Sequence, residues 1–102
     1  MQAPDKPQVT ALILETARRV ILDLRPEDRF PIDESSDIYG GSSRFDSVGI
    51  MAFVIELEEV LEANCGRRIP LADERALAEP QVPFKNVPLL TEYISRRLAE
   101  AR

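Results

Sequence analysis

A serine directly after an aspartate is the residue pair of this sequence best placed to do chemistry. Asp46 and Ser47 are followed by Val48 and Gly49, and a run with helical periodicity begins at this point. An aspartate can cap a helix, and the unpaired N–H groups of a helix N-terminus, together with the helix dipole, can hold a phosphate. These residues predict a serine that accepts a phosphate-bearing prosthetic group, rather than one that attacks a substrate.

The composition argues against several classes of function. The chain has 102 residues, with 13 Lys and Arg against 18 Asp and Glu, and it has no histidine. Without histidine, the commonest general base and the usual metal ligand are missing, so we expect no catalytic residue, no metal site and no enzyme activity. The formal net charge of −5 disfavours nucleic acid as a partner and favours basic protein surfaces.

The length fits one domain over residues 1–102, and we expect residues 1–4 and 100–102 to fray. The first residues lack the basic and apolar parts of a signal peptide, and no apolar run approaches membrane-spanning length. The single cysteine, Cys65, allows no intrachain disulfide and is expected to be a filler rather than a nucleophile. We therefore expect a cytoplasmic monomer without a membrane span.

Helical spacing and helix-end signals predict an all-α fold. Asp5, with Gln8 three residues later, is typical of a helix start, and Pro26 is expected to end this first helix. The second helix is predicted over residues 47–64, before Gly66. A short helix over residues 73–79 and a last helix from Asn86 complete a four-helix bundle of three main helices and one short one.

The connection between the first two predicted helices, residues 24–45, is unusually long for a compact domain. It is acceptable if the connection packs on itself, with a short turn of helix near residues 33–38. Five apolar or aromatic side chains are its expected anchors: Phe30, Ile32, Ile38, Tyr39 and Phe45.

The second predicted helix carries more apolar surface than one core face needs. One face is complete with Ile50, Phe53, Val54, Leu57 and Leu61. Val48, Met51 and Ile55 form a neighbouring stripe, which is either buried by two other helices or exposed as a docking ridge. In the second case Glu56, Glu58, Glu59 and Glu62 would frame an apolar patch with negative charge, which suits fast, electrostatically steered encounters.

The ordered set of motifs over residues 45–98 resembles the acyl carrier protein family. The likeness rests on Asp46-Ser47-Val48-Gly49, the helical run Ile50–Glu59, Ile69-Pro70, Phe84-Lys85-Asn86-Val87 and Tyr93-Ile94. Val48 stands where the family more often has leucine. Arg44 places a positive charge near the expected phosphate, which could help to hold it. Residues 71–83 are longer and richer in proline than in compact fatty-acid carriers.

The resemblance implies an acyl-carrier-like four-helix bundle with a 4′-phosphopantetheine arm on Ser47. A phosphopantetheinyl transferase would attach the arm from coenzyme A with magnesium. Partners would be a ligase that loads acyl or aminoacyl groups and a downstream acyltransferase or synthase, docking on Val48, Met51, Ile55, Glu58 and Glu59. The unusual residues 71–83 favour a specialised aminoacyl, polyketide or special-lipid pathway.

An alternative from another class remains open at this point. The chain can be an unmodified helical adaptor, which binds a protein through Val48, Met51 and Ile55 while Ser47 only helps to cap the helix. The two hypotheses differ in what they require of Ser47, because only the carrier needs its hydroxyl for loading.

Overall fold

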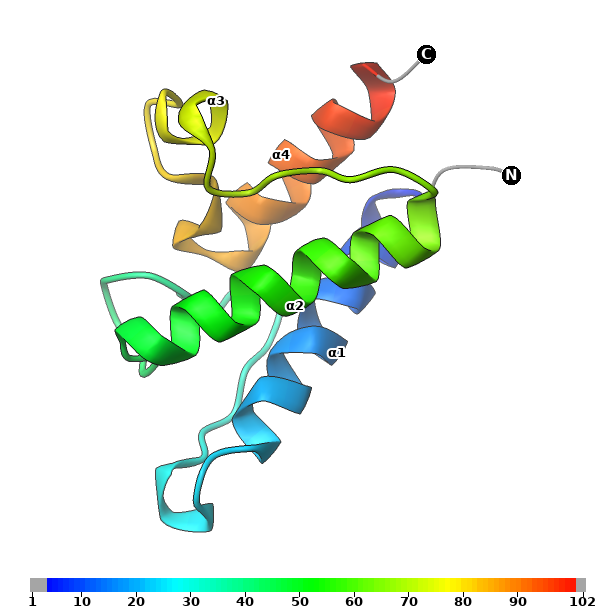
Figure 1. The fold of residues 1–102 in the computed structure, drawn as a ribbon. Coiled ribbons are helices and arrows are strands. Elements are labelled where there is room, and N and C mark those ends of the chain that lie inside the picture. Colours follow the sequence, from blue (N-terminus) through cyan, green and yellow to red (C-terminus); the bar gives the residue numbers. More distant parts are fainter. Residues whose placement is uncertain (1–3, 101–102) are drawn as a thin grey trace.

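The computed structural model describes residues 4–100, which form four α-helices and two 3-10 turns (Figure 1). The helices are α1 (Lys6–Leu22), α2 (Ser47–Cys65), α3 (Glu74–Leu77) and α4 (Val87–Glu100), and the 3-10 turns are η1 (Pro26–Asp28) and η2 (Pro83–Lys85). There is no β-strand within these residues. The predicted all-α bundle, with three long helices, one short helix and a long first connection, is confirmed.

Most of the residues predicted to fray, 1–3 and 101–102, lie outside the described part of the chain. Pro4 precedes α1 without helical structure, whereas Glu100 is the last residue of α4. Glu100 also forms an ion pair with Arg75, which connects the end of α4 to α3.

The start of α1 follows the prediction and its end does not. Asp5 accepts a hydrogen bond from the Gln8 N–H at 3.0 Å, and the Gln8 side chain accepts one from the Asp5 N–H at 2.8 Å, so the capping box is present. The helix ends at Leu22, before the predicted limit at Pro26. Because proline disfavours the helical region for the preceding residue, Arg25 is extended, with ψ at 147°.

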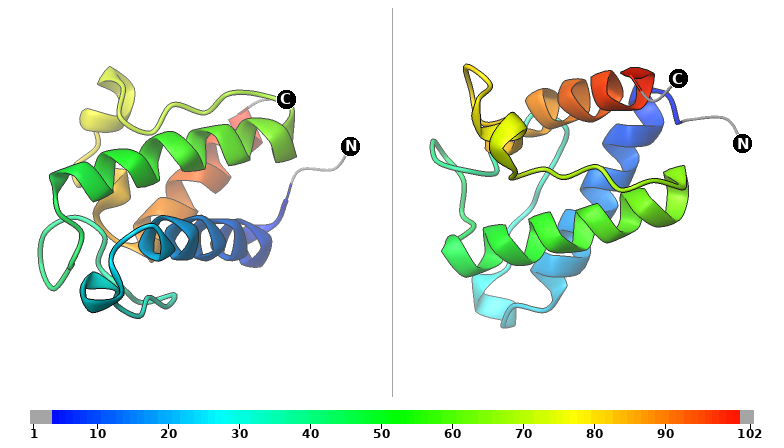
Figure 2. Two further views of the ribbon diagram at one scale, coloured as in Figure 1. Left: turned by 60° about the horizontal axis from the view of Figure 1, so that its bottom comes forward. Right: turned by 45° about the horizontal axis from the view of Figure 1, so that its top comes forward.

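The core lies where α1 packs against both α2 and α4 (Figures 1 and 2). Among its fully buried side chains are Ile13, Leu57, Leu90 and Ile94, and Phe53 and Tyr93 are the two largest. Each of the four buried aliphatic side chains stabilises the folded state by roughly 1.5–3 kcal/mol, because it is removed from water. The buried Thr16 hydroxyl donates a hydrogen bond to the Leu12 carbonyl at 2.8 Å, so it is satisfied.

The long connection between α1 and α2 packs through most of its predicted anchors. Ile32, Ile38 and Phe45 are buried, and Phe30 is partly buried against them. Tyr39 was wrongly predicted as an anchor, because half of its surface is exposed. Its ring instead meets the edge of Phe84, with the ring centroids 5.7 Å apart.

The predicted helical turn near residues 33–38 is also wrong. The Asp33 carboxylate accepts hydrogen bonds from the N–H and the hydroxyl of Ser35, at 2.9 and 2.8 Å, which closes a turn rather than a helix. These bonds hold the pKa of Asp33 below its ordinary value. The short helical segment of this connection is η1, immediately after α1.

Backbone hydrogen bonds attach this connection to the segment ahead of α4. The Ile38 N–H donates to the Lys85 carbonyl at 2.7 Å, and the Val87 N–H donates to the Ser36 carbonyl at 3.1 Å. Because these polar groups are paired, the part of the connection that follows η1 can pack on the helices without a strand or helix of its own.

The second connection begins and ends with helix caps that the sequence predicted. Gly66 ends α2 in the left-handed region, with φ at 74°. Residues 66–71 then run back alongside α2 (Figure 1), and Ile69 and Leu71 are fully buried. Asn86 caps α4 by accepting a hydrogen bond from the Leu89 N–H at 2.8 Å. Helix α3 is shorter than the predicted 73–79.

Candidate functional site

Ser47 is the first residue of α2, and it is exposed. Asp46 is the N-cap, and its carboxylate accepts a hydrogen bond from the Gly49 N–H at 2.7 Å. The Asp46 carbonyl accepts the first helical bond, from the Ile50 N–H at 2.9 Å. A helix start leaves its first N–H groups, here those of Ser47 and Val48, without an intrahelical partner, so they are available to bind an anion.

Gly49 is needed for packing at this helix start. A Cβ atom at this position would lie 3.1 Å from Cδ1 of Phe45 and 3.2 Å from Oδ1 of Asp46. Both contacts are tight, so a side chain at residue 49 would push on the capping carboxylate and on the ring. The glycine therefore lets the cap and Phe45 sit close to α2.

Phe45 fixes the position at which α2 begins. It is buried, its ring stacks on Phe53 of α2 with centroids 5.9 Å apart, and Phe30 meets it edge-on at 4.9 Å. Such aromatic pairs contribute roughly 0.5–1.5 kcal/mol beyond area burial. The residue before the Asp46–Ser47 pair thus holds the serine at a defined place on the core.

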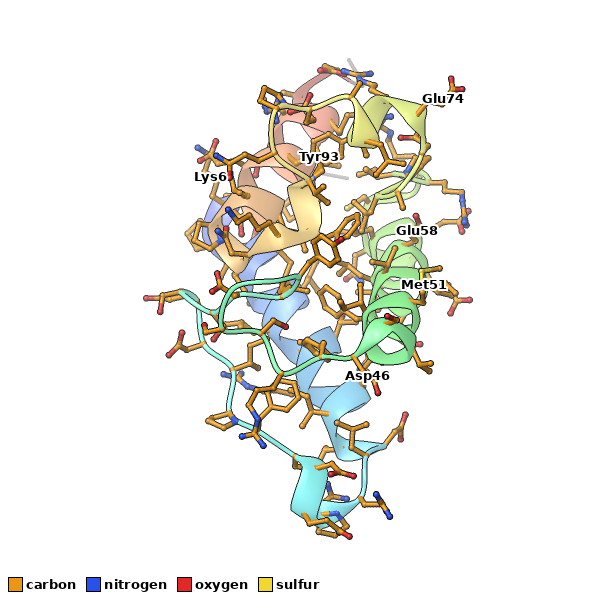
Figure 3. The ribbon with its side chains drawn as sticks, turned by 90° about the vertical axis from the view of Figure 1, so that its left-hand side faces the viewer. Lys6, Asp46, Met51, Glu58, Glu74 and Tyr93 are labelled. Carbon is orange, nitrogen blue, oxygen red and sulfur yellow. The ribbon has the colours of Figure 1, made fainter. Side chains whose placement is uncertain are left out.

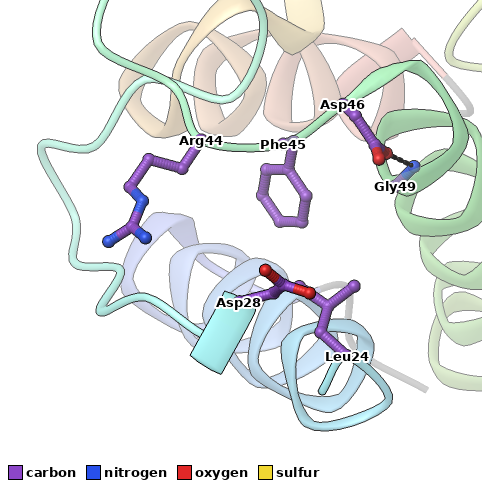
Figure 4. A pocket seen from close by; sticks show the side chains of 6 residues that line it. All are labelled: Leu24, Asp28, Arg44, Phe45, Asp46 and Gly49. Carbon is purple, nitrogen blue, oxygen red and sulfur yellow. Dashed lines mark hydrogen bonds between the residues drawn. The ribbon is translucent and has the colours of Figure 1, made fainter. Parts of the chain in front are cut away.

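Arg44 does not lie where the sequence suggested. A pocket of about 290 Å³ in front of α2 is lined by Arg44, Asp46 and Gly49, among others (Figure 4). The Arg44 side chain extends away from Asp46 and Gly49, and its guanidinium carbon lies 5.4 Å from the centre of the Phe30 ring. In this arrangement its charge stacks on an aromatic ring and points away from Asp46.

The second apolar stripe of α2 is exposed. Val48 keeps 78% of its surface accessible, Met51 55% and Ile55 52%. The interpretation in which two other helices bury this stripe is therefore wrong. Figure 3 shows Met51 on α2 between the levels of Asp46 and Glu58. We call Val48, Met51 and Ile55 the apolar ridge.

The acids of α2 do not form the open negative frame that the sequence suggested. The Glu58 side chain is only 12% exposed; it accepts hydrogen bonds from Arg68 at 3.1 Å and from the Leu71 N–H at 2.9 Å. Glu56 forms an ion pair with Arg19 of α1 at 3.4 Å, and Glu62 lies 4.0 Å from Arg68.

Glu59 is the one acid of α2 for which the described residues provide no ion pair. At 3.6 residues per turn it projects from the middle of the exposed face, close to the line of Val48 and Ile55. Of the two acids predicted to guide partners, Glu59 is the exposed one. Glu58 instead fastens residues 68–71 to α2.

Cys65 is partly buried at the end of α2. Burial raises the pKa of its thiol, although Arg67 opposes this effect, so the reactive thiolate is scarcer than for an ordinary cysteine. This agrees with the expectation of a filler rather than a nucleophile.

Sequence reasoning missed the pairing of Arg19 and Arg68 with the acids of α2, because it joins residues from different elements. Phe45 was correctly predicted as an anchor of the long connection, but its role in supporting the Asp46–Ser47 pair was not predicted, although the run Phe45-Asp46-Ser47 was the available signal.

Comparisons with protein-family models, with characterised proteins and with solved structures gave no match for this chain. No helix within residues 4–100 has the length and apolar character that crossing a bilayer requires. Within the same residues, no three His, Cys, Asp or Glu side chains gather as metal ligands would.

Proposed function

We propose that this chain is a carrier protein and that Ser47 is the attachment site of 4′-phosphopantetheine. The observation that carries the proposal is the exposed Ser47 hydroxyl at the start of a long, capped helix, directly beside an exposed apolar ridge. When attached, the group supplies a thiol on a long flexible arm, which holds acyl or aminoacyl cargo as thioesters. The residues at the start of α2 fit the group, since Ser47 is exposed and the first N–H groups of a helix have no intrahelical partner and can bind a phosphate.

Each residue of the site has a distinct task in this proposal. The Ser47 hydroxyl gives up its proton to the transferase and forms a new bond to phosphorus, while the pyrophosphate bond of coenzyme A breaks and its adenosine-bearing half leaves. Asp46 holds the first turn of α2 through Gly49, so the backbone that carries the Ser47 side chain is fixed.

The apolar ridge is the proposed surface on which partner enzymes dock. Exposed methionine and branched side chains can adapt to several partners, as a carrier that visits several enzymes requires. We propose a loading ligase and an acyltransferase or synthase as these partners, in a specialised aminoacyl, polyketide or special-lipid pathway. The extended second connection, with its short α3, supports this direction over an ordinary fatty-acid role.

The test is the intact mass of the protein after incubation with coenzyme A, magnesium and a broad-specificity phosphopantetheinyl transferase. The wild type should gain the mass of one phosphopantetheine, and Ser47→Ala should gain nothing. Ser42→Ala is a matched control, because this exposed serine lies in the same region, its hydroxyl bonds only to Asp37, and the substitution should leave the gain intact. No gain on the wild type, with a transferase that modifies a known carrier in parallel, would favour the unmodified adaptor.

A further inference from the structure

A groove between the end of α1 and the start of α2 lies beside Ser47 and extends from one end of the apolar ridge. It measures about 310 Å³ and opens to solvent on one side. Its floor is apolar and is formed by four side chains. Val20 belongs to α1, Leu24 follows the end of α1, and Val48 and Ala52 belong to α2. Val48 belongs to both the groove and the apolar ridge, so the two form one continuous surface.

The rim of the groove is acidic. Asp23, Asp46 and Glu56 lie along it, and Arg19 is its one basic residue. Arg19 is paired with Glu56 at 3.4 Å, so the charges that remain without an ion pair among the described residues are those of Asp23 and Asp46. An apolar floor with a net negative rim complements an apolar side chain that has a lysine or arginine next to it.

The position of the groove beside Ser47 indicates which kind of protein would bind over it. Asp46 and Val48 line the groove and flank Ser47 in the chain, so an enzyme that binds over Ser47 lies next to the groove. The volume is at the lower end of the range for small-molecule pockets, and the groove is open, which suits an inserted side chain better than an enclosed ligand.

We infer that this groove receives an apolar side chain of the phosphopantetheinyl transferase, with a basic side chain of that enzyme beside Asp23 and Asp46. The inference rests on the proposed function, and it adds α1 to the recognised surface. The transferase then contacts both α1 and α2, so its binding depends on how these two helices are placed relative to each other.

Ala52→Arg tests the inference, because it places a long basic side chain over the groove. Ala63→Arg is the matched control: both alanines are exposed on α2, and about three helical turns put them on nearly the same line of the helix. The two variants have the same net charge and nearly the same helix propensity. The readout is the rate of loading from coenzyme A at several carrier concentrations, with circular dichroism to check the fold.

Loading of Ala52→Arg should be slower than that of wild type by about tenfold, mainly through a higher KM for the carrier, while Ala63→Arg stays within about twofold. Equal rates for the two variants, with a wild type that loads, would overturn the groove and leave the proposed function standing. A wild type that does not load would overturn both.

A second pair of variants tests the charge of the rim without filling the groove. Asp23→Lys should slow loading, and the effect should shrink at high salt. Glu15→Lys, at an exposed position on α1 that does not line the groove, should have little effect. Similar rates for these two variants at low salt would contradict the basic partner side chain.

Discussion

The two edges of the exposed face of α2 are made from the same kind of pair, a glutamate of α2 and an arginine of another element, yet they differ in burial. On one edge the Glu58 side chain is 12% exposed and binds both Arg68 and the backbone of Leu71. On the other edge Glu56 and Arg19 are 41% and 49% exposed, and they border an open groove.

This difference shows that counting the acids on a helix does not give the negative charge that the helix presents to a partner. A mostly buried carboxylate that accepts a backbone N–H holds the fold together, and its loss leaves polar groups unsatisfied. A half-exposed ion pair contributes little to stability and can be rearranged by a partner. One edge of α2 is therefore closed, and the other borders an open groove.

The largest expected effect is a difference in the free energy of unfolding between a variant at the closed edge and a variant on the apolar ridge. Leu71 is fully buried, so Leu71→Ala should lower the free energy of unfolding by about 2–5 kcal/mol. Val48 is 78% exposed, so Val48→Ala should change the same quantity by less than about 0.5 kcal/mol. Urea unfolding measures both, and similar losses would show that residues 66–71 are not packed on α2 as described.

The next comparison tests the two glutamates directly. Glu58→Ala removes the acceptor for Leu71 and Arg68 and should cost about 1–3 kcal/mol of unfolding free energy. Glu56→Ala breaks only a half-exposed pair and should cost less than about 1 kcal/mol. If Glu56→Ala proved the more destabilising variant in urea, the assignment of closed and open edges would be reversed.

Met51→Glu tests the apolar ridge itself. It should slow loading by about tenfold, which is ~1.4 kcal/mol, because it puts a charge in the centre of the proposed contact. Stability should stay near that of the wild type, since Met51 is 55% exposed. The loading rate and the thermal unfolding midpoint are measured together. Unfolding of the variant would mean that Met51 belongs to the core.

The smallest expected effect on the loading rate comes from Glu59, which lies between the two edges of the exposed face of α2. Glu59→Lys should slow loading by about threefold at low salt and by less at high salt, because its charge guides a basic partner over a distance that salt shortens. The matched change Glu15→Lys on α1 should leave the rate nearly unchanged. A rate for Glu59→Lys that does not depend on salt would remove the steering argument.

Features that depend on neighbours in the sequence were predicted well. Asp5 with Gln8, Asp46 before Ser47, Gly66 and Asn86 all mark helix ends where the structure has them. These positions are set by local hydrogen bonds and by the left-handed conformation that glycine adopts readily, and both can be recognised in a short stretch of sequence.

Features that depend on contacts across the fold were predicted poorly. The burial of Glu58 follows from the return of residues 66–71 along α2, and the pairing of Arg19 follows from the packing of α1 on α2. Arg44 and Tyr39 were misplaced for the same reason, because their aromatic partners Phe30 and Phe84 come from other parts of the chain. Helical periodicity identifies faces of a helix, but it does not say which element covers each face.

Localising the added group by trypsin digestion of the loaded protein tests the central claim most directly. Cleavage after Arg44 separates Ser42 and Ser43 from the peptide of residues 45–67, in which Ser47 is the only hydroxyl-bearing residue. We predict that the mass of one phosphopantetheine is found on this peptide after treatment with coenzyme A, magnesium and transferase. The same mass on the peptide of residues 30–44, or no added mass with a transferase that modifies a known carrier, would contradict the assignment of Ser47 as the attachment site.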